Sequence, residues 1–215
     1  MADFSRRLPV YLLIDCSGSM RGERIEAVKQ GIRSLVAELK SDPQALETAY
    51  LSVITFSSTA KQVEKLTELM LFQEPEFVTA GATMFGRALE LLIECINTEV
   101  RKSTETQKGD WKPLVFILTD GAPSDVLDFK RCAEILKTMP IANIVACAAG
   151  ADAKTEYLKM ITDNVFMMNS LSAGDMAKFF AWVSSSIKMT SNKPGALLND
   201  SPMLPPGPKS FQFVP

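Results

Sequence analysis

Three short segments carry oxygen-bearing side chains of the kind that bind a hard metal ion. The first is Asp15-Cys16-Ser17-Gly18-Ser19, in which a carboxylate is followed by hydroxyls at alternate positions around a glycine suited to a tight turn. Thr83 and Asp120 supply one more hydroxyl and one more carboxylate. Neutral hydroxyls and carboxylates together suit Mg²⁺ or Mn²⁺. The sequence has no histidine, so Ser-His-Asp and Cys-His catalysis within this chain are excluded.

Each of these segments also has a simpler structural interpretation. Serine and aspartate commonly cap helices and glycine marks turns, so residues 15–19 alone could be a strand end followed by a helix cap. Thr83 could cap the helix that follows it, and Asp120 could stabilise a turn with Gly121. The metal interpretation therefore depends on whether the fold brings the three segments together.

Apolar runs indicate the strands and helices that must position these side chains. Residues 9–14 and 113–118 are continuously apolar, as in strands buried on both faces of a parallel sheet. They predict strands at 9–14 and 113–119, and each of these is followed by an aspartate. Further strands are predicted at 51–56, 60–66, 141–149 and 165–168, and helices at 24–39, 85–100, 128–139, 155–161 and 172–187.

This alternation predicts an α/β fold, with a doubly wound, mostly parallel central sheet, one antiparallel edge strand and helices on both faces. The carboxyl ends of parallel strands lie along one edge of such a sheet, where ligands bind. Asp15, Thr83 and Asp120 are therefore expected to meet there.

The composition is that of a globular domain with a distinct tail. The chain has 215 residues, of which 47% are hydrophobic and 22% charged. We predict a domain over residues 1–190 and a Pro-rich, extended tail over 191–215. The tail either has no fixed structure or docks on a partner or on its own domain through Phe211, Phe213 and Val214.

Charge and cysteine usage exclude several classes of protein. The net charge of −2, without a basic stripe, gives no reason to expect nucleic acid as a partner. Neither a secretory signal nor a membrane-spanning apolar stretch is evident, and the four cysteines form no C-x-x-C pair. Reduced, buried thiols and a cytoplasmic location are expected.

The three segments, in this order on alternating strands and helices, closely resemble the metal-ion-dependent adhesion site of the von Willebrand factor A (VWA) domain family. Its pattern is D-x-S-x-S, then a threonine, then an aspartate, and the resemblance covers about residues 8–188. All five positions match: Asp15, Ser17, Ser19, Thr83 and Asp120.

The resemblance implies a Rossmann-like fold and a bound Mg²⁺, with Mn²⁺ or Ca²⁺ as alternatives. It implies that the hydroxyls bind the ion directly, and that one or both aspartates act through water. An open coordination position would then accept an Asp or Glu carboxylate from a partner protein. This describes an interaction module and not an enzyme.

A narrower resemblance concerns the opening residues 6–15, the segment around residues 40–48 and the short length of the chain. These features are similar to the TerY-type VWA proteins of bacterial tellurium-resistance clusters. That similarity implies an adaptor in a cytosolic stress-response or tellurite-resistance complex.

Two other functions fit part of the pattern. A Mg²⁺-dependent phosphoryl-transfer enzyme could use Asp15 as nucleophile with Asp120 and Asp125 as an acidic metal pair, as in the haloacid-dehalogenase family. That family places a second aspartate two residues after the first, where this chain has Ser17. The chain could also be the VWA subunit of an AAA+ machine, with the motor on another chain because no G-x-x-x-x-G-K-[ST] motif is present.

Overall fold

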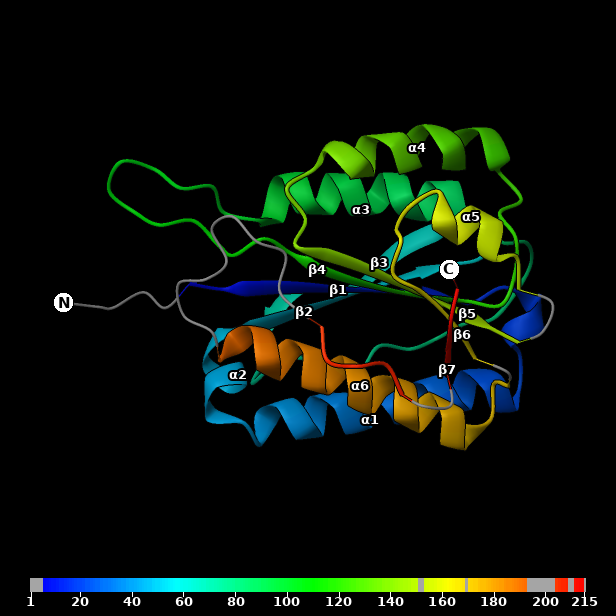
Figure 1. The fold of residues 1–215 in the computed structure, drawn as a ribbon, viewed down its shortest axis with the longest axis horizontal. Coiled ribbons are helices and arrows are strands. Elements are labelled where there is room, and N and C mark those ends of the chain that lie inside the picture. Colours follow the sequence, from blue (N-terminus) through cyan, green and yellow to red (C-terminus); the bar gives the residue numbers. More distant parts are fainter. Residues whose placement is uncertain (1–5, 151–152, 169, 193–203, 209–210, 215) are drawn as a thin grey trace.

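A seven-stranded β-sheet forms the centre of the protein, with helices on both faces (Figure 1). The computed structural model describes residues 6–150, 153–168, 170–192, 204–208 and 211–214. The strand order is β3-β2-β1-β4-β5-β6-β7. The strands are β1 (Leu8–Asp15), β2 (Ala49–Phe56), β3 (Ala60–Glu68), β4 (Leu114–Thr119), β5 (Asn143–Ala149), β6 (Val165–Met168) and β7 (Phe211–Phe213).

Five strands of this sheet run parallel, which confirms the predicted doubly wound α/β class. The predicted antiparallel edge strand is β3, which pairs with β2. The opposite edge carries a further antiparallel strand, β7, which pairs with β6.

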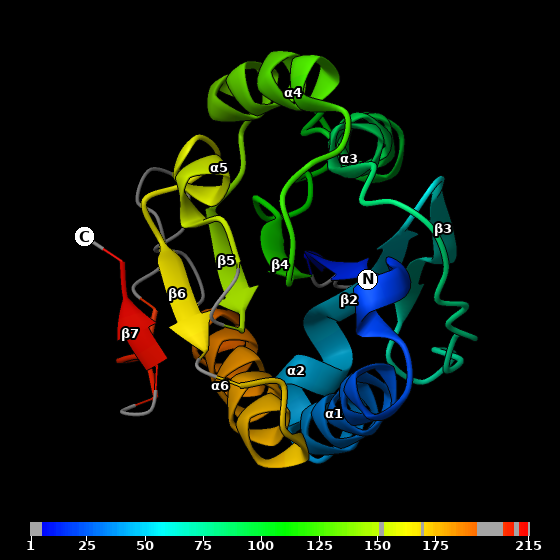
Figure 2. The ribbon, with the colours of Figure 1, turned by 90° about the vertical axis from the view of Figure 1, so that its right-hand side faces the viewer.

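The helices form one layer on each side of the sheet (Figure 2). One layer contains α1 (Glu23–Lys40), α2 (Pro43–Thr48) and α6 (Ala173–Ser191), and the other contains α3 (Phe85–Glu99), α4 (Val126–Thr138) and α5 (Thr155–Lys159). A short 3-10 turn, η1 (Gly18–Met20), precedes α1. None of the helices described here is long and apolar enough to cross a membrane.

Alternate side chains of β1 enter the two cores, which explains why the strand is apolar throughout. Leu12 belongs to the core under α1 and α6, and Leu13 belongs to the core under α3 and α4. Both side chains are at most 1% exposed. A central strand of a doubly wound sheet has no solvent-facing side, so a period-two pattern is absent.

The short helix α2 lies outside the ranges that the sequence pattern predicted to be helical. No helix was predicted between residues 39 and 85, but Pro43 begins α2. The Asp42 carboxylate accepts a hydrogen bond from the Ala45 N–H at 2.8 Å and so caps this helix. Proline suits the first position of a helix because its missing N–H would have no partner there.

The strand order determines where the loops of β1 and β4 lie. The two strands are adjacent and parallel, with Ile14 opposite Leu118. The chain leaves β1 towards α1 on one face and leaves β4 towards α4 on the other (Figure 2). The order of the sheet reverses between these strands, and in open α/β sheets ligands bind at such a point.

The described part of the tail packs against the domain. β7 pairs with β6, with Phe211 opposite Met168, and the Trp182 indole donates a hydrogen bond to the Pro205 carbonyl at 3.1 Å. These residues follow the expectation that the tail docks on its own domain. Residues 193–203, 209–210 and 215 of the tail lie outside the described residues, and the division at residue 190 stays a prediction.

Packing between α1 and α6 requires a residue without a side chain at Gly31. A Cβ built there would lie 2.0 Å from Cδ2 of Phe180, which is fully buried. We expect Gly31→Ala to lower the free energy of unfolding by about 1–3 kcal/mol, because this overpacking exceeds the gain of about 1 kcal/mol in helix propensity.

Urea denaturation followed by circular dichroism measures this effect. The matched control is Gly174→Ala in α6, where the nearest atom to a new Cβ is the Ser172 hydroxyl at 3.9 Å. We expect that variant to be as stable as wild type or more stable. Equal stability of Gly31→Ala and wild type would show that α6 moves away without cost.

Candidate metal centre

Asp15 ends β1 and is completely buried. Its Oδ1 accepts a hydrogen bond from the Ser17 N–H at 2.8 Å, and its Oδ2 accepts one from the Thr119 hydroxyl at 2.6 Å. Burial raises the pKa of Asp15, and these hydrogen bonds act in the opposite direction because they stabilise the carboxylate. The carboxylate is therefore held from two sides, by its own loop and by β4.

A series of side-chain contacts joins the first segment to the third. The Ser17 and Ser19 hydroxyl oxygens lie 3.1 Å apart, and the Ser19 hydroxyl donates to Asp120 Oδ1 at 2.8 Å. Ser19 and Asp120 are 101 positions apart in sequence. The fold therefore brings the D-x-S-x-S segment and the aspartate after β4 into direct contact.

The loop that carries Thr83 lies against both of these segments. The Gly18 N–H donates to the Gly81 carbonyl at 3.0 Å, and the Ser124 N–H donates to the Thr83 carbonyl at 2.8 Å. A Cβ built on Gly121 would lie 3.4 Å from Thr83 Oγ1, so the hydroxyl faces the turn after Asp120. All three predicted segments thus meet at one edge of the sheet.

Gly81 allows this loop to approach the end of β2 closely. Its φ of 69° is in the left-handed region, and a Cβ there would lie 1.9 Å from the Ser58 hydroxyl oxygen. That hydroxyl accepts a hydrogen bond from the Ala82 N–H at 3.1 Å. Only glycine fits this position without displacing Ser58.

Thr83 does not cap α3. The N-cap residue is Met84, and the Asp125 carboxylate accepts hydrogen bonds from the N–H groups of Gly86 and Arg87, each at 2.9 Å. This arrangement leaves the Thr83 hydroxyl free of the capping role that its sequence position favoured. It also places both Asp125 oxygens at the α3 terminus, where they satisfy backbone donors.

The donor set has the chemistry of a site for a hard divalent ion. It consists of three hydroxyls and two carboxylates, and hard oxygen ligands of this kind suit Mg²⁺, Mn²⁺ or Ca²⁺. Among the residues that the structure describes, no group of three or more His, Cys, Asp or Glu side chains could hold a metal. Cys16 is buried within the loop, and burial with the nearby Asp15 raises the pKa of its thiol to about 12.

Two residues of the site were missed by the sequence analysis. Thr119 positions Asp15, but its place at the end of an apolar run indicated only a buried strand. Arg24 donates from Nη1 to Asp120 Oδ2 at 3.0 Å, but its place in the first turn of α1 indicated an exposed helix position. Neither contact has a signal in the local pattern, because each partner is distant in sequence.

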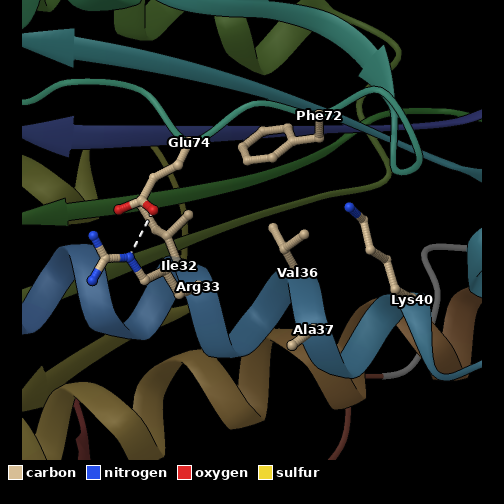
Figure 3. A pocket seen from close by; sticks show the side chains of 7 residues that line it. All are labelled: Ile32, Arg33, Val36, Ala37, Lys40, Phe72 and Glu74. Atoms are coloured by element: carbon tan, nitrogen blue, oxygen red, sulfur yellow. Dashed lines mark hydrogen bonds and ion pairs between the residues drawn. The ribbon is translucent and has the colours of Figure 1, made fainter.

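A separate cavity of about 260 Å³ lies between α1 and the segment at residues 72–74 (Figure 3). Its apolar lining includes Ile32, Val36 and Phe72, and Arg33 Nε donates to Glu74 across it at 2.6 Å. None of the five predicted metal ligands lines this cavity.

Solved structures share this fold at low sequence identity. A von Willebrand factor type A protein from Catenulispora acidiphila aligns with a TM-score of 0.68 and 18% identity, over 86% of this chain and 43% of that one. Proximal thread matrix protein 1 from the mussel byssus, with a zinc-occupied MIDAS motif, aligns with a TM-score of 0.60 and 18% identity, over 89% of this chain and 47% of that one. The pilus adhesin SpaC from Lactobacillus rhamnosus GG aligns with a TM-score of 0.68 and 16% identity, over 86% and 30%.

These similarities concern the fold, and this chain spans less than half the length of each of the three structures. A comparison with curated proteins finds no match. The sequence itself matches the von Willebrand factor type A domain over residues 10–181, which is most of the chain. Together with the doubly wound sheet, this match shows that the chain belongs to the von Willebrand factor type A domain family.

Proposed function

We propose that this chain is a metal-dependent protein-binding module whose metal centre lies at the carboxyl edge of the sheet. The hydroxyls of Ser17, Ser19 and Thr83 and the carboxylates of Asp15 and Asp120 would hold Mg²⁺, Mn²⁺ or Ca²⁺. The observation that carries this proposal is the Ser17–Ser19–Asp120 contact series, which joins the ends of β1 and β4 through oxygen ligands only.

The few formal charges of the site suggest what the ion would bind. The two carboxylates would neutralise the charge of a divalent ion only in part, because the negative charge of Asp120 is already paired with Arg24. An ion held mainly by neutral hydroxyls attracts a further anionic oxygen ligand, such as the carboxylate of a partner's Asp or Glu. Support by analogy comes from the mussel protein, whose MIDAS motif holds zinc.

The geometry supports a phosphoryl-transfer enzyme less well than it supports a binding module. Asp125, the second acid of the imagined metal pair, caps α3 through both of its oxygens. Ser17, at the position where an acid is needed, contacts Ser19 and provides no carboxyl group for proton transfer. These contacts favour a binding module over an enzyme with Asp15 as nucleophile.

We further propose that the module is an adaptor in a bacterial cytosolic stress-response or tellurite-resistance complex. The support is the similarity of residues 6–15 and of the segment around residues 40–48 to the TerY-type proteins. Deletion of the gene should then lower the tellurite concentration that inhibits growth of the source organism, and the wild-type gene should restore it. Unchanged inhibition would contradict this role and leave the metal-binding proposal intact.

Removal of two hydroxyl ligands tests the metal centre. We expect Mn²⁺ to raise the Tm of the wild-type protein, because an ion that binds only the folded state stabilises it. The double variant Ser17→Ala, Thr83→Val should lose this shift in differential scanning fluorimetry, since two of three neutral ligands are gone.

Ser185→Ala is the matched control, because it removes an exposed hydroxyl on α6 that donates to the Ala181 carbonyl at 3.0 Å. It should keep the full Mn²⁺-dependent shift. The same proteins should then be used to capture partners from a lysate of the source organism, with Mg²⁺ or with EDTA. A partner bound equally by wild type and the double variant, with and without Mg²⁺, would contradict metal-dependent binding.

Thr119 should act on metal affinity through Asp15. Thr119→Val removes the hydroxyl that donates to Asp15 Oδ2, which raises the pKa of the buried carboxyl further and disfavours its ionised form. We expect Mn²⁺ affinity at pH 7 to fall about tenfold in isothermal titration calorimetry, the scale of losses on removing a partner of a metal ligand. Thr119→Ser should retain near wild-type Mn²⁺ affinity. An unchanged Mn²⁺ affinity in Thr119→Val would mean that the hydrogen bond from Thr119 to Asp15 contributes nothing to metal binding.

A further inference from the structure

Arg24 places a positive charge directly on the candidate metal centre. Its Nη1 donates to Asp120 Oδ2 at 3.0 Å and to the Ser19 carbonyl at 3.1 Å. The Arg24 side chain is 46% exposed, whereas the Asp120 side chain is 5% exposed. The guanidinium therefore lies between the Asp120 carboxylate and solvent.

Helix electrostatics do not explain why an arginine occupies this position. Arg24 is in the first turn of α1, where the helix dipole favours acids and disfavours cations. The acids Glu23 and Glu26 of the same turn follow that preference. The contact with Asp120 crosses from α1 to the loop after β4, so it acts on the site and not on the helix.

The contact affects any ion held by Asp120. The Oδ1 atom of this carboxylate accepts from Ser19, and Oδ2 accepts from Arg24. A divalent cation would compete with the guanidinium for the same carboxylate and would be repelled by its charge. Arg24 should therefore weaken binding of the ion alone.

The same side chain favours an anionic partner group. A guanidinium has five N–H donors in a planar fork that matches a carboxylate, and within the described residues only Nη1 makes hydrogen bonds. The Nε and Nη2 donors remain available at the half-exposed edge of the site. A carboxylate that approaches the ion would gain a second cationic contact.

We propose that Arg24 determines the selectivity of the metal centre for a partner carboxylate. It weakens binding of the ion alone and stabilises the complex of protein, ion and carboxylate. The proposal rests on the metal-binding function proposed above. Because coupling between two ligands is reciprocal, a carboxylate should raise metal affinity more in wild type than in a variant without the guanidinium. The protein would then retain its ion best when an acidic partner is bound.

Two titrations of the full chain test this idea. Mn²⁺ alone is titrated by isothermal calorimetry, and acetate binding to the Mn²⁺-loaded protein is followed by the ¹³C relaxation of acetate. For Arg24→Ala we expect Mn²⁺ to bind about two- to fivefold more tightly and acetate to bind about two- to fivefold more weakly, the scale of an exposed ion pair. Arg24→Lys keeps the charge without the fork, so it should retain the Mn²⁺ affinity of wild type but lose part of the acetate affinity.

Arg21→Ala is the matched control, because it removes the same charge from an exposed residue three positions away, for which the described residues contain no ion pair. Both affinities should stay at the wild-type values, and circular dichroism confirms that each variant is folded. The role of Arg24 would be overturned if Arg24→Ala left both affinities unchanged, or if it shifted the Mn²⁺ and acetate affinities in the same direction. Binding of Mn²⁺ to the wild-type protein would in that case still support the metal centre. Absence of Mn²⁺ binding to wild type would overturn both proposals.

Discussion

The burial of the Asp15 carboxylate is the constraint on which the site depends. An ionisable group at the end of a central strand loses its hydration, and this loss must be offset by hydrogen bonds. One bond comes from the Ser17 N–H and the other from the Thr119 hydroxyl on the neighbouring strand. The need to satisfy both carboxylate oxygens therefore links the conformation of the first loop to the register of β1 against β4.

The remaining parts of the site follow from that link. With β1 and β4 in register, the Ser19 hydroxyl contacts Asp120, and the loop at residues 79–84 bridges the two segments through backbone hydrogen bonds. Asp125 satisfies the α3 terminus, so the hydroxyl of Thr83 is not used there. Asp125 therefore has a structural role at the α3 terminus, which is separate from that of the candidate oxygen ligands.

The charge balance at this edge distinguishes the site from a cluster of acids. Within the part of the chain that the structure describes, no cationic side chain is hydrogen-bonded to the buried Asp15, whereas Asp120 is paired with Arg24 at the rim. A guanidinium next to neutral hydroxyls lowers the attraction for a bare cation and raises that for an anion. The two effects together suit a centre that binds an ion and an acidic partner jointly.

The sequence alone determined the fold class and the composition of the candidate ligand set. Continuous apolar runs ending at Asp15 and Asp120, alternating with amphipathic helices, were sufficient to predict a doubly wound sheet with both aspartates at one edge. These signals are local, since they depend on the spacing of apolar side chains and on where each run stops. The helix at residues 43–48 was missed because proline is typical of the end of a helix, whereas Pro43 stands at the first position of α2.

Only the tertiary structure decided which polar groups contact one another. Thr119 and Arg24 are ordinary members of a buried strand and an exposed helix turn until the fold places them on Asp15 and Asp120. The same holds for β7, whose pairing with β6 gives the tail a place at the edge of the sheet. Hydrogen bonds between residues about a hundred positions apart leave no periodic signal, because their geometry exists only after the strands have packed in register.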